Sequence, residues 1–337
     1  GSSLNMTGNA TLNMVGTSVD RSGVRIDGTS TVSGNASVNM EGNSTDHYGV
    51  YVQGDGLFTD GAKVNVTGSS TAFPGVGFIG RMSLEDSANL NATGTSDMRS
   101  GIWIQGVNVS GNAGVDLAGR RTTNAGVYMA SATSLTDGAK LNVTGSSVDG
   151  HAAWIAGPLT ASGNASVDLA GNSSEGYGAL VTGGASLADG AKLDLTGTSA
   201  NGTGAGVTGN TSLTGGATLN LTGNSTNGRG ASVSGNTSLA GDAKLDVTGT
   251  SVAAEGAWLT NVNVSGNASV ALVGNSTNGS GAIANGNTSL ADGAKLNVTG
   301  TSVDGDGARI WQNLSIAGNA SVALMGSSTN GTGATVN

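Results

Sequence analysis

One alternating phrase of small or apolar and polar residues recurs along the whole chain. It reads Ala-x-Leu/Val-x-Val/Leu/Met-x-Gly, and its alanines lie 26 residues apart except for two intervals of 25, after Ala88 and Ala243. Alternation with a period of two is typical of a strand with one buried face. Each phrase therefore predicts a strand. The 13 copies begin at Ala10, Ala36, Ala62, Ala88, Ala113, Ala139, Ala165, Ala191, Ala217, Ala243, Ala268, Ala294 and Ala320.

Two shorter apolar patterns follow in each repeat. A second strand is predicted 14 to 16 residues after the alanine, where the outer two positions are apolar, as in Val50 and Val52 or Ile102 and Ile104. A third, shorter strand is predicted around an apolar residue four positions before the next alanine, such as Phe58. Each repeat thus contains three strands and no helical pattern.

Three strands per repeat form one turn of a coil that cannot bury its apolar face alone, whereas stacked turns share a continuous core. We therefore predict an all-β fold, a right-handed parallel β-helix (solenoid) of about 13 rungs of 26 residues with three strands per rung. Leu193, Leu195 and Val233 should point inward. Because the repeat spacing is so regular, residues 1–337 are predicted to form a single β-helix domain with no internal boundary.

Glycine and serine mark the end of the first strand. The glycine of each phrase, such as Gly42 or Gly68, is predicted to form a sharp corner at positive φ. Two positions later almost every repeat has a serine, as at Ser44 and Ser70, and only Arg121 breaks the series. By parity these serines point inward, where their hydroxyls should bond one another and nearby backbone. So many copies exclude a catalytic nucleophile at this position.

Composition narrows the possible functions. Glycine makes up 60 of the 337 residues, cysteine is absent, and the net charge is −9. The fold therefore needs no disulfide, and the few dispersed lysines and arginines argue against nucleic acid as a partner. No stretch of 18 apolar residues exists to span a membrane as a helix.

Many repeats alternate between GNASVxLxGNST, as around Ala165 and Ala268, and DGAKLxVTGTS, as around Ala191 and Ala294. In this style of repeat the chain resembles the passenger domains of autotransporters (type V secretion) of the pertactin, diffuse-adherence and self-associating type. The resemblance implies a β-helix exported through the periplasm and outer membrane to the bacterial cell surface, and it implies a C-terminal membrane barrel outside this passenger fragment. Many such passengers are adhesins with roles in virulence and biofilm formation.

The resemblance implies a surface adhesin that mediates adhesion to host surfaces or cell–cell aggregation through the side of the β-helix. Its partner would be a host surface glycan or matrix protein, or the same protein on a neighbouring cell. Two alternatives stay open: a polysaccharide-processing β-helix enzyme, and a purely structural stalk that presents another domain.

We expect no enzyme activity, no cofactor and no metal. Asp116, Asp168, Asp194 and Asp246 share the outward middle position of the first strand, and paired carboxylates are the machinery of glycoside hydrolases. Asparagine fills the same position in seven repeats, however, which favours a solvated polar ladder, and Lys192 is placed to neutralise Asp194. Repeats of nearly constant length also leave no long loop to form a cleft wall. The only two histidines, His47 and His151, lie about four repeats apart and cannot share an ion.

The middle residue of the second strand is predicted to face outward, since it lies between two inward neighbours. Three of the four tryptophans occupy this position, in a chain with 3% aromatic residues. Exposed apolar patches often mark binding surfaces, and Trp and Tyr are enriched at interaction hot spots. The competing interpretation is that a neighbouring loop covers these rings or that they only stabilise the sheet. The candidate contact stripe consists of Tyr51, Trp103, Tyr128, Trp154, Leu180 and Trp258.

Overall fold

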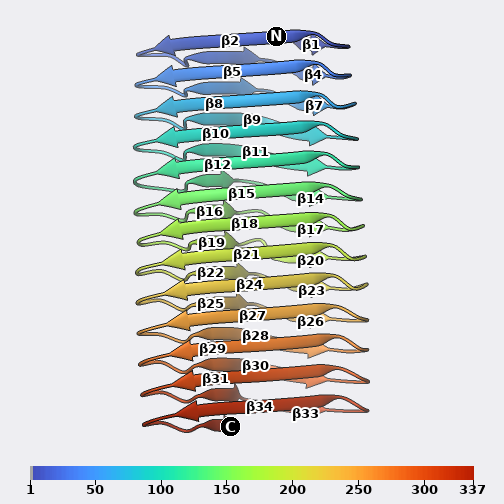
Figure 1. Ribbon diagram of the computed structural model, residues 1–337, viewed down its shortest axis with the longest axis vertical. Coiled ribbons are helices and arrows are strands. Elements are labelled where there is room, and N and C mark those ends of the chain that lie inside the picture. Colours follow the sequence, from blue (N-terminus) through green and yellow to red (C-terminus); the bar gives the residue numbers. More distant parts are fainter. Residues whose placement is uncertain (1–2) are drawn as a thin grey trace. The chain divides into compact units, whose positions relative to one another are not determined.

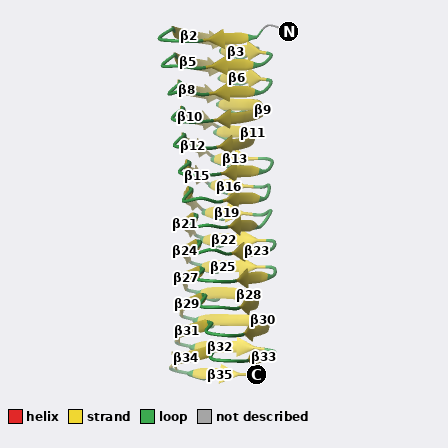
Figure 2. Cartoon of the chain, turned by 90° about the vertical axis from the view of Figure 1, so that its right-hand side faces the viewer, coloured by secondary structure: helices red, strands yellow, loops and turns green. Residues whose placement is uncertain are grey.

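The computed structural model describes residues 3–337 and consists there of strands and loops, with no helix (Figure 2). The strands are parallel and stack as a β-solenoid of about 13 turns with a repeat of about 26 residues, which confirms the predicted fold class (Figure 1). The chain divides into two compact units, one ending at Ala170 and the other beginning at Gly171. This boundary falls inside a strand, and the single domain expected from the repeat stays a prediction.

The long first strand of each turn starts directly after the repeat alanine. It runs to the serine two positions after the repeat glycine, or to Arg121 in the one turn that lacks this serine. These strands are β2 (Thr11–Ser18), β5 (Ser37–Ser44), β8 (Lys63–Ser70), β10 (Asn89–Ser96), β12 (Gly114–Arg121), β15 (Lys140–Ser147), β18 (Ser166–Ser173), β21 (Lys192–Ser199), β24 (Thr218–Ser225), β27 (Lys244–Ser251), β29 (Ser269–Ser276), β31 (Lys295–Ser302) and β34 (Ser321–Ser328).

The second strand of each turn carries the candidate contact stripe. These strands are β3 (Val24–Asp27), β6 (Val50–Gln53), β9 (Val76–Leu84), β11 (Ile102–Val109), β13 (Val127–Met129), β16 (Ala153–Ile155), β19 (Ala179–Val181), β22 (Ala205–Thr208), β25 (Ala231–Ser234), β28 (Ala257–Val264), β30 (Ala282–Leu290), β32 (Ala308–Trp311) and β35 (Ala334–Val336).

The third strands are short, and in four turns they are continuous with the second strand, as β9, β11, β28 and β30. The separate third strands are β1 (Leu4–Met6), β4 (Ser30–Val32), β7 (Gly56–Phe58), β14 (Thr133–Leu135), β17 (Leu159–Ala161), β20 (Ala185–Leu187), β23 (Thr211–Leu213), β26 (Thr237–Leu239) and β33 (Leu314–Ile316).

Equivalent positions of successive turns stack on one another within each unit. In the unit that ends at Ala170, β5 pairs with β8 so that Val38 lies beside Val64. In the other unit, β21 pairs with β24 so that Leu193 lies beside Leu219. Leu193 and Val233 are fully buried, and Leu195 is 1% exposed. The structure thus confirms the predicted inward register.

The glycines that end the repeat phrase do not have the positive φ that the sequence suggested. Gly42 and Gly68 lie inside strands β5 and β8 and are absent from the residues with positive φ. A Cβ at Gly68 would lie 2.1 Å from the carbonyl oxygen of Gly75, because the chain folds back directly onto this strand. The prediction of a corner was therefore wrong, and glycine is required here for close approach of backbone.

The left-handed backbone lies instead two residues before each repeat alanine. All thirteen residues at this position have φ between 53° and 71°, and each is Gly or Asp, as at Gly215 and Asp292. Gly adopts this conformation without strain, and Asp tolerates it better than most side chains do. The alternating phrases thus supply two solutions to one turn.

The two 25-residue turns lose their residue at one place. Strand β11 pairs with β9 with a register shift between Ile104 and Gly106, and β28 pairs with β30 with a shift between Thr260 and Val262. These shifts lie in the turns that follow Ala88 and Ala243, between the second and third strand. The second and third strands are continuous in both of these turns, as β11 and β28, and also in two 26-residue turns, as β9 and β30, so the missing residue is not required for continuity.

The corner serines of the interior turns are buried, as predicted, with Ser44 4% and Ser70 7% exposed. Their hydroxyls bond backbone, as Ser70 illustrates. The Ser70 Oγ donates to the carbonyl of His47, in the preceding turn, at 2.6 Å, and it accepts from the N–H of Phe73 at 3.1 Å. The expected bonds between stacked hydroxyls are replaced by these backbone bonds, which fix the start of the loop that leads to the second strand.

Candidate functional site

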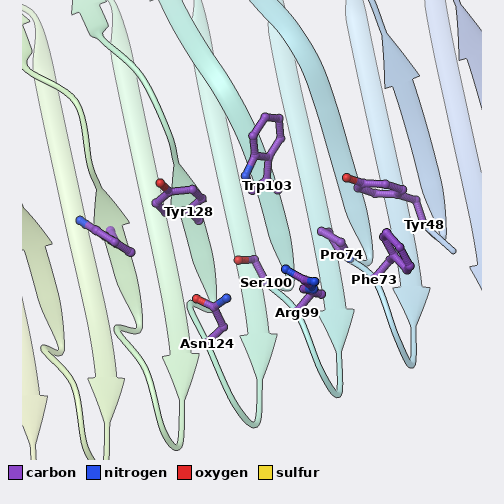
Figure 3. A pocket seen from close by; sticks show the side chains of 9 residues that line it. Tyr48, Phe73, Pro74, Arg99, Ser100, Trp103, Asn124 and Tyr128 are labelled. Atoms are coloured by element: carbon purple, nitrogen blue, oxygen red, sulfur yellow. The ribbon is translucent and has the colours of Figure 1, made fainter. Parts of the chain in front are cut away.

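An aromatic-lined groove of about 430 Å³ lies on the unit that ends at Ala170, over the second strands and the loops that precede them (Figure 3). Trp103 of β11, Tyr128 of β13 and Trp154 of β16 come from successive turns, and all three are half-buried. The loops contribute the remaining lining residues, Tyr48, Phe73, Pro74, Arg99, Ser100 and Asn124. We call this site the aromatic groove.

Strand pairing sets the spacing of the three rings. Trp103 pairs in register with Tyr128, and Tyr128 pairs with Trp154. The Tyr128 and Trp154 ring centroids are 4.7 Å apart with a 50° angle between the planes, and His151 meets Trp154 edge-on at the same distance. Because stacked strands fix the backbones, the rings form a preorganised apolar floor.

The middle position of the second strand varies in its exposure from turn to turn. Leu180 is 2% exposed, and Ser232 and Ile283 at the same position are each 3% exposed. The aromatic rings at this position are half-buried, and Arg25 is exposed. The prediction that Leu180 belongs to a contact stripe is therefore corrected, since a partner has no access to it.

Two other predicted stripe residues reach solvent but have a neighbour against the ring. The Arg229 guanidinium lies 4.0 Å from the Trp258 ring centroid and pairs with Glu255 at 2.9 Å. Tyr51 lies in a separate cluster, with Tyr48 4.9 Å away and the Arg25 guanidinium 5.1 Å above its ring. Of the six predicted residues, the structure brings Trp103, Tyr128 and Trp154 together in one groove.

A loop residue decides how well the next turn is covered. Tyr48, three residues before the middle of its own second strand, lies over Gly77 of the next turn, where a Cβ would be 2.4 Å from the ring. Tyr177 lies over Gly206 in the same way, at 2.6 Å. In the turns before Trp103 and Tyr128 the equivalent loop residues are the small Pro74 and Ser100.

Those small residues leave the Trp103 and Tyr128 rings uncovered, and both also line the aromatic groove. Sequence reasoning missed the loop residues because it followed the strands alone. The signal was present: loops that precede β6, β9 and β11 read DHYG, AFPG and MRSG, whereas most others combine Asn, Asp, Thr and Gly.

Two guanidinium groups lie at the loop side of the groove. Arg99 is exposed, and within residues 3–337 its side chain forms no ion pair. Arg121, which replaces the corner serine, is 5% exposed, and its Nη2 donates to the Thr123 hydroxyl at 2.5 Å. Burial and the nearby charge of Arg99 lower the pKa of Arg121 to about 10. Its Nε and Nη1 have no protein partner.

Both histidines flank this aromatic surface. His47 stacks on Phe73 with ring centroids 5.1 Å apart, and its Nδ1 lies 2.7 Å from the Ser22 hydroxyl. Burial lowers the pKa of His47, as do the charges of Arg25 and Arg21, and burial alone lowers the pKa of His151. Both imidazoles are therefore neutral at pH 7.

The acidic ladder has partners that suit a structural role. The Asp116 carboxylate accepts from the Asn142 amide at 2.6 Å. Asp194 pairs with Lys192 at 2.5 Å and accepts from Asn220 at 2.7 Å, and Asp246 pairs with Lys244 at 2.6 Å. Asp168 accepts from Ser166 at 3.4 Å. The aromatic groove has no carboxylate in its lining.

Within residues 3–337 no group of three or more His, Cys, Asp or Glu side chains is placed to hold a metal ion. The same residues include no helix that is long and apolar enough to cross a membrane.

Comparison of the chain with protein-family models gave no match, and neither curated proteins nor solved structures gave a match. The functional argument therefore rests on the fold and on the aromatic groove.

Proposed function

We propose that the chain is the ligand-binding passenger of a bacterial surface adhesin, which attaches cells to glycan-bearing surfaces or to one another through the aromatic groove. The observation that carries this proposal is the row of Trp103, Tyr128 and Trp154 on three successive turns over a concavity of about 430 Å³. Small-molecule and saccharide sites are concave, mainly apolar, and lined by a few polar groups of this kind.

The chemistry of the lining favours a saccharide. Tyr and Trp rings offer flat faces with a negative quadrupole, which suit the flat, weakly positive C–H face of a sugar ring. Asn124 at the loop side is exposed and offers an amide group for the sugar hydroxyls (Figure 3). Surface localisation, export through the outer membrane and a barrel anchor outside the fragment belong to the same proposal, and they rest on the resemblance of the repeats.

A polysaccharide-processing enzyme is the second candidate, and the side chains favour it less. Glycoside hydrolysis needs two carboxyl groups on opposite sides of one bond. The ladder aspartates described above bond serine, asparagine or lysine, and the aromatic groove contains none of them.

The test is the double substitution Trp103→Ala with Trp154→Ala in a surface-displayed version of the chain. We expect cell aggregation and binding to an immobilised glycan panel to fall by about tenfold or more, since two hot-spot rings are removed. The melting temperature and the amount on the surface should stay close to those of the parent. Trp258→Ala is the matched control, because that ring occupies the same strand position but is capped by Arg229.

Unchanged binding in the double variant would overturn the proposal and would favour the stalk, in which the solenoid only presents another domain. A fall in stability without any specific loss of binding would have the same meaning.

A further inference from the structure

The aromatic groove has a charge opposite to that of the chain as a whole. The chain carries a net charge of −9, yet Arg99 is the one ionised side chain in the lining of the groove. Five of the thirteen lysines and arginines lie within 3.6 Å of a carboxylate, and Arg99 is not among them. Among the lysines and arginines that form no ion pair within residues 3–337, Arg99 is the one that lines the groove. A guanidinium without an ion pair beside apolar rings favours a ligand that carries an anionic group.

Arg121 adds to the positive potential at the same edge. It occupies a corner where the other turns have serine, and its side chain is buried close enough to Arg99 for the two charges to repel. Its two unpartnered nitrogens are shielded from solvent, so Arg121 acts on a ligand through its field and not by contact. No carboxylate lines the groove, and Asp149, which lies outside the lining, acts on Arg121 less strongly than Arg99 does.

Resting on the proposed function, we propose that the aromatic groove selects an acidic oligosaccharide, whose sugar ring stacks on Trp103 and Tyr128 while its carboxylate or sulfate pairs with Arg99. Figure 3 shows Arg99 and Ser100 on the loop side, with the rings of Trp103 and Tyr128 across from them. The planar guanidinium can donate two parallel hydrogen bonds to either anion. The same charge disfavours trimethylammonium ligands, which aromatic cages otherwise attract.

The test measures binding of three defined probes to the purified chain by titration calorimetry, with tryptophan fluorescence as a second readout. Tetragalacturonate supplies carboxylates, its full methyl ester supplies the same rings without charge, and a κ-carrageenan tetrasaccharide supplies sulfate without carboxylate. We expect at least one anionic probe to bind about tenfold or more tightly than the methyl ester, with an affinity that falls as salt rises.

The variant Arg99→Gln should reduce the affinity for the anionic probe by about tenfold and leave the weak binding of the methyl ester unchanged. Arg99 is exposed, so the melting temperature should stay the same. Arg229→Gln is the matched control: it removes an arginine that lies over a tryptophan but is already neutralised by Glu255, and it should not alter binding.

The outcomes separate the two proposals. Equal binding of the methyl ester and the anionic probes, with no effect of Arg99→Gln, overturns the selection for acidic sugars and leaves a glycan-binding groove in place. Binding of none of the probes overturns the acidic-sugar inference, and the glycan panel with Trp103→Ala and Trp154→Ala then decides the proposed function separately. Loss of anionic binding in Arg229→Gln as well would assign the effect to net charge instead of the groove.

Discussion

Within residues 3–337, the residue two positions before each repeat alanine has left-handed backbone in every turn. Substitution of Asp292 by Ala should cost about 1 kcal/mol of unfolding free energy, because an alanine there suffers the clash of Cβ with the following carbonyl. Asp292→Gly should change the unfolding free energy by less than about 0.5 kcal/mol, since Gly adopts this conformation freely and stands at the same position in other turns.

Urea denaturation followed by circular dichroism measures both variants, with Lys295→Ala on the exposed face of β31 as the control. Equal destabilisation by Ala and Gly at this position would contradict the argument from backbone conformation and would point to a role of the carboxylate.

The two histidines predict how stability depends on pH. Because burial lowers the pKa of His151 below its ordinary value of 6.5, the unfolded chain binds a proton more readily than the folded chain does. The folded state should therefore lose stability as the pH falls from 6.5 towards the lowered pKa, with no further loss from this group below it. His47 acts in the same direction.

The urea midpoint measured between pH 7.5 and pH 5 checks this expectation. The double variant His47→Gln with His151→Gln should have a flatter profile across that range than the parent chain. Parent and variant profiles of the same slope would show that other groups are responsible.

At the scale of the strand, a charged side chain at an inward position should destabilise the core. Leu193 of β21 is fully buried beside Leu219 of the next turn, so Leu193→Asp would bury an unpaired carboxylate. We expect a loss of about 3–5 kcal/mol in unfolding free energy. Thr196→Asp, which points outward from the same strand, should cost less than about 1 kcal/mol. Similar unfolding midpoints for the two variants would refute the inward register.

The sequence predicted strands well wherever alternation is regular. The inward positions of the first and second strands, such as Leu193 and Ile102, follow directly from the period of two and are buried. The continuous strands β9, β11, β28 and β30 were not predicted, because the spacing of apolar residues does not show whether the backbone between the second and third strands stays extended. The role of Gly68 was also wrong, because the carbonyl of Gly75 that excludes a Cβ there comes from a backward fold of the chain.

The candidate site was predictable in part. Parity placed Trp103, Tyr128 and Trp154 on the side away from the core, and the structure brings them together. Parity did not show that Leu180 is buried, since the pattern along one strand does not show what packs above it. Arg99 was not predicted for the same reason, because it reaches the groove from a loop.

At the scale of the whole molecule, we expect no turnover of polysaccharides. The turns have nearly constant length, the groove lining lacks carboxylates, and the ladder aspartates bond serine, asparagine or lysine. Incubation with plant, bacterial and host polysaccharides should release no reducing ends and no unsaturated products above a buffer control. Turnover that disappears in Asp168→Asn would contradict this expectation and revive the enzyme hypothesis.

The stacking of equivalent positions has a consequence for how such a gene can change. A duplication of one whole repeat inserts a turn whose strands meet their neighbours in the existing register, so its coding sequence can lengthen or shorten by crossover between copies without a folding defect. Both 25-residue turns show where the deletion of one codon is accommodated: each lacks its residue at the corner between the second and third strands. The number of repeats can therefore change during evolution. Each repeat gained or lost before the aromatic groove changes the number of turns that precede it.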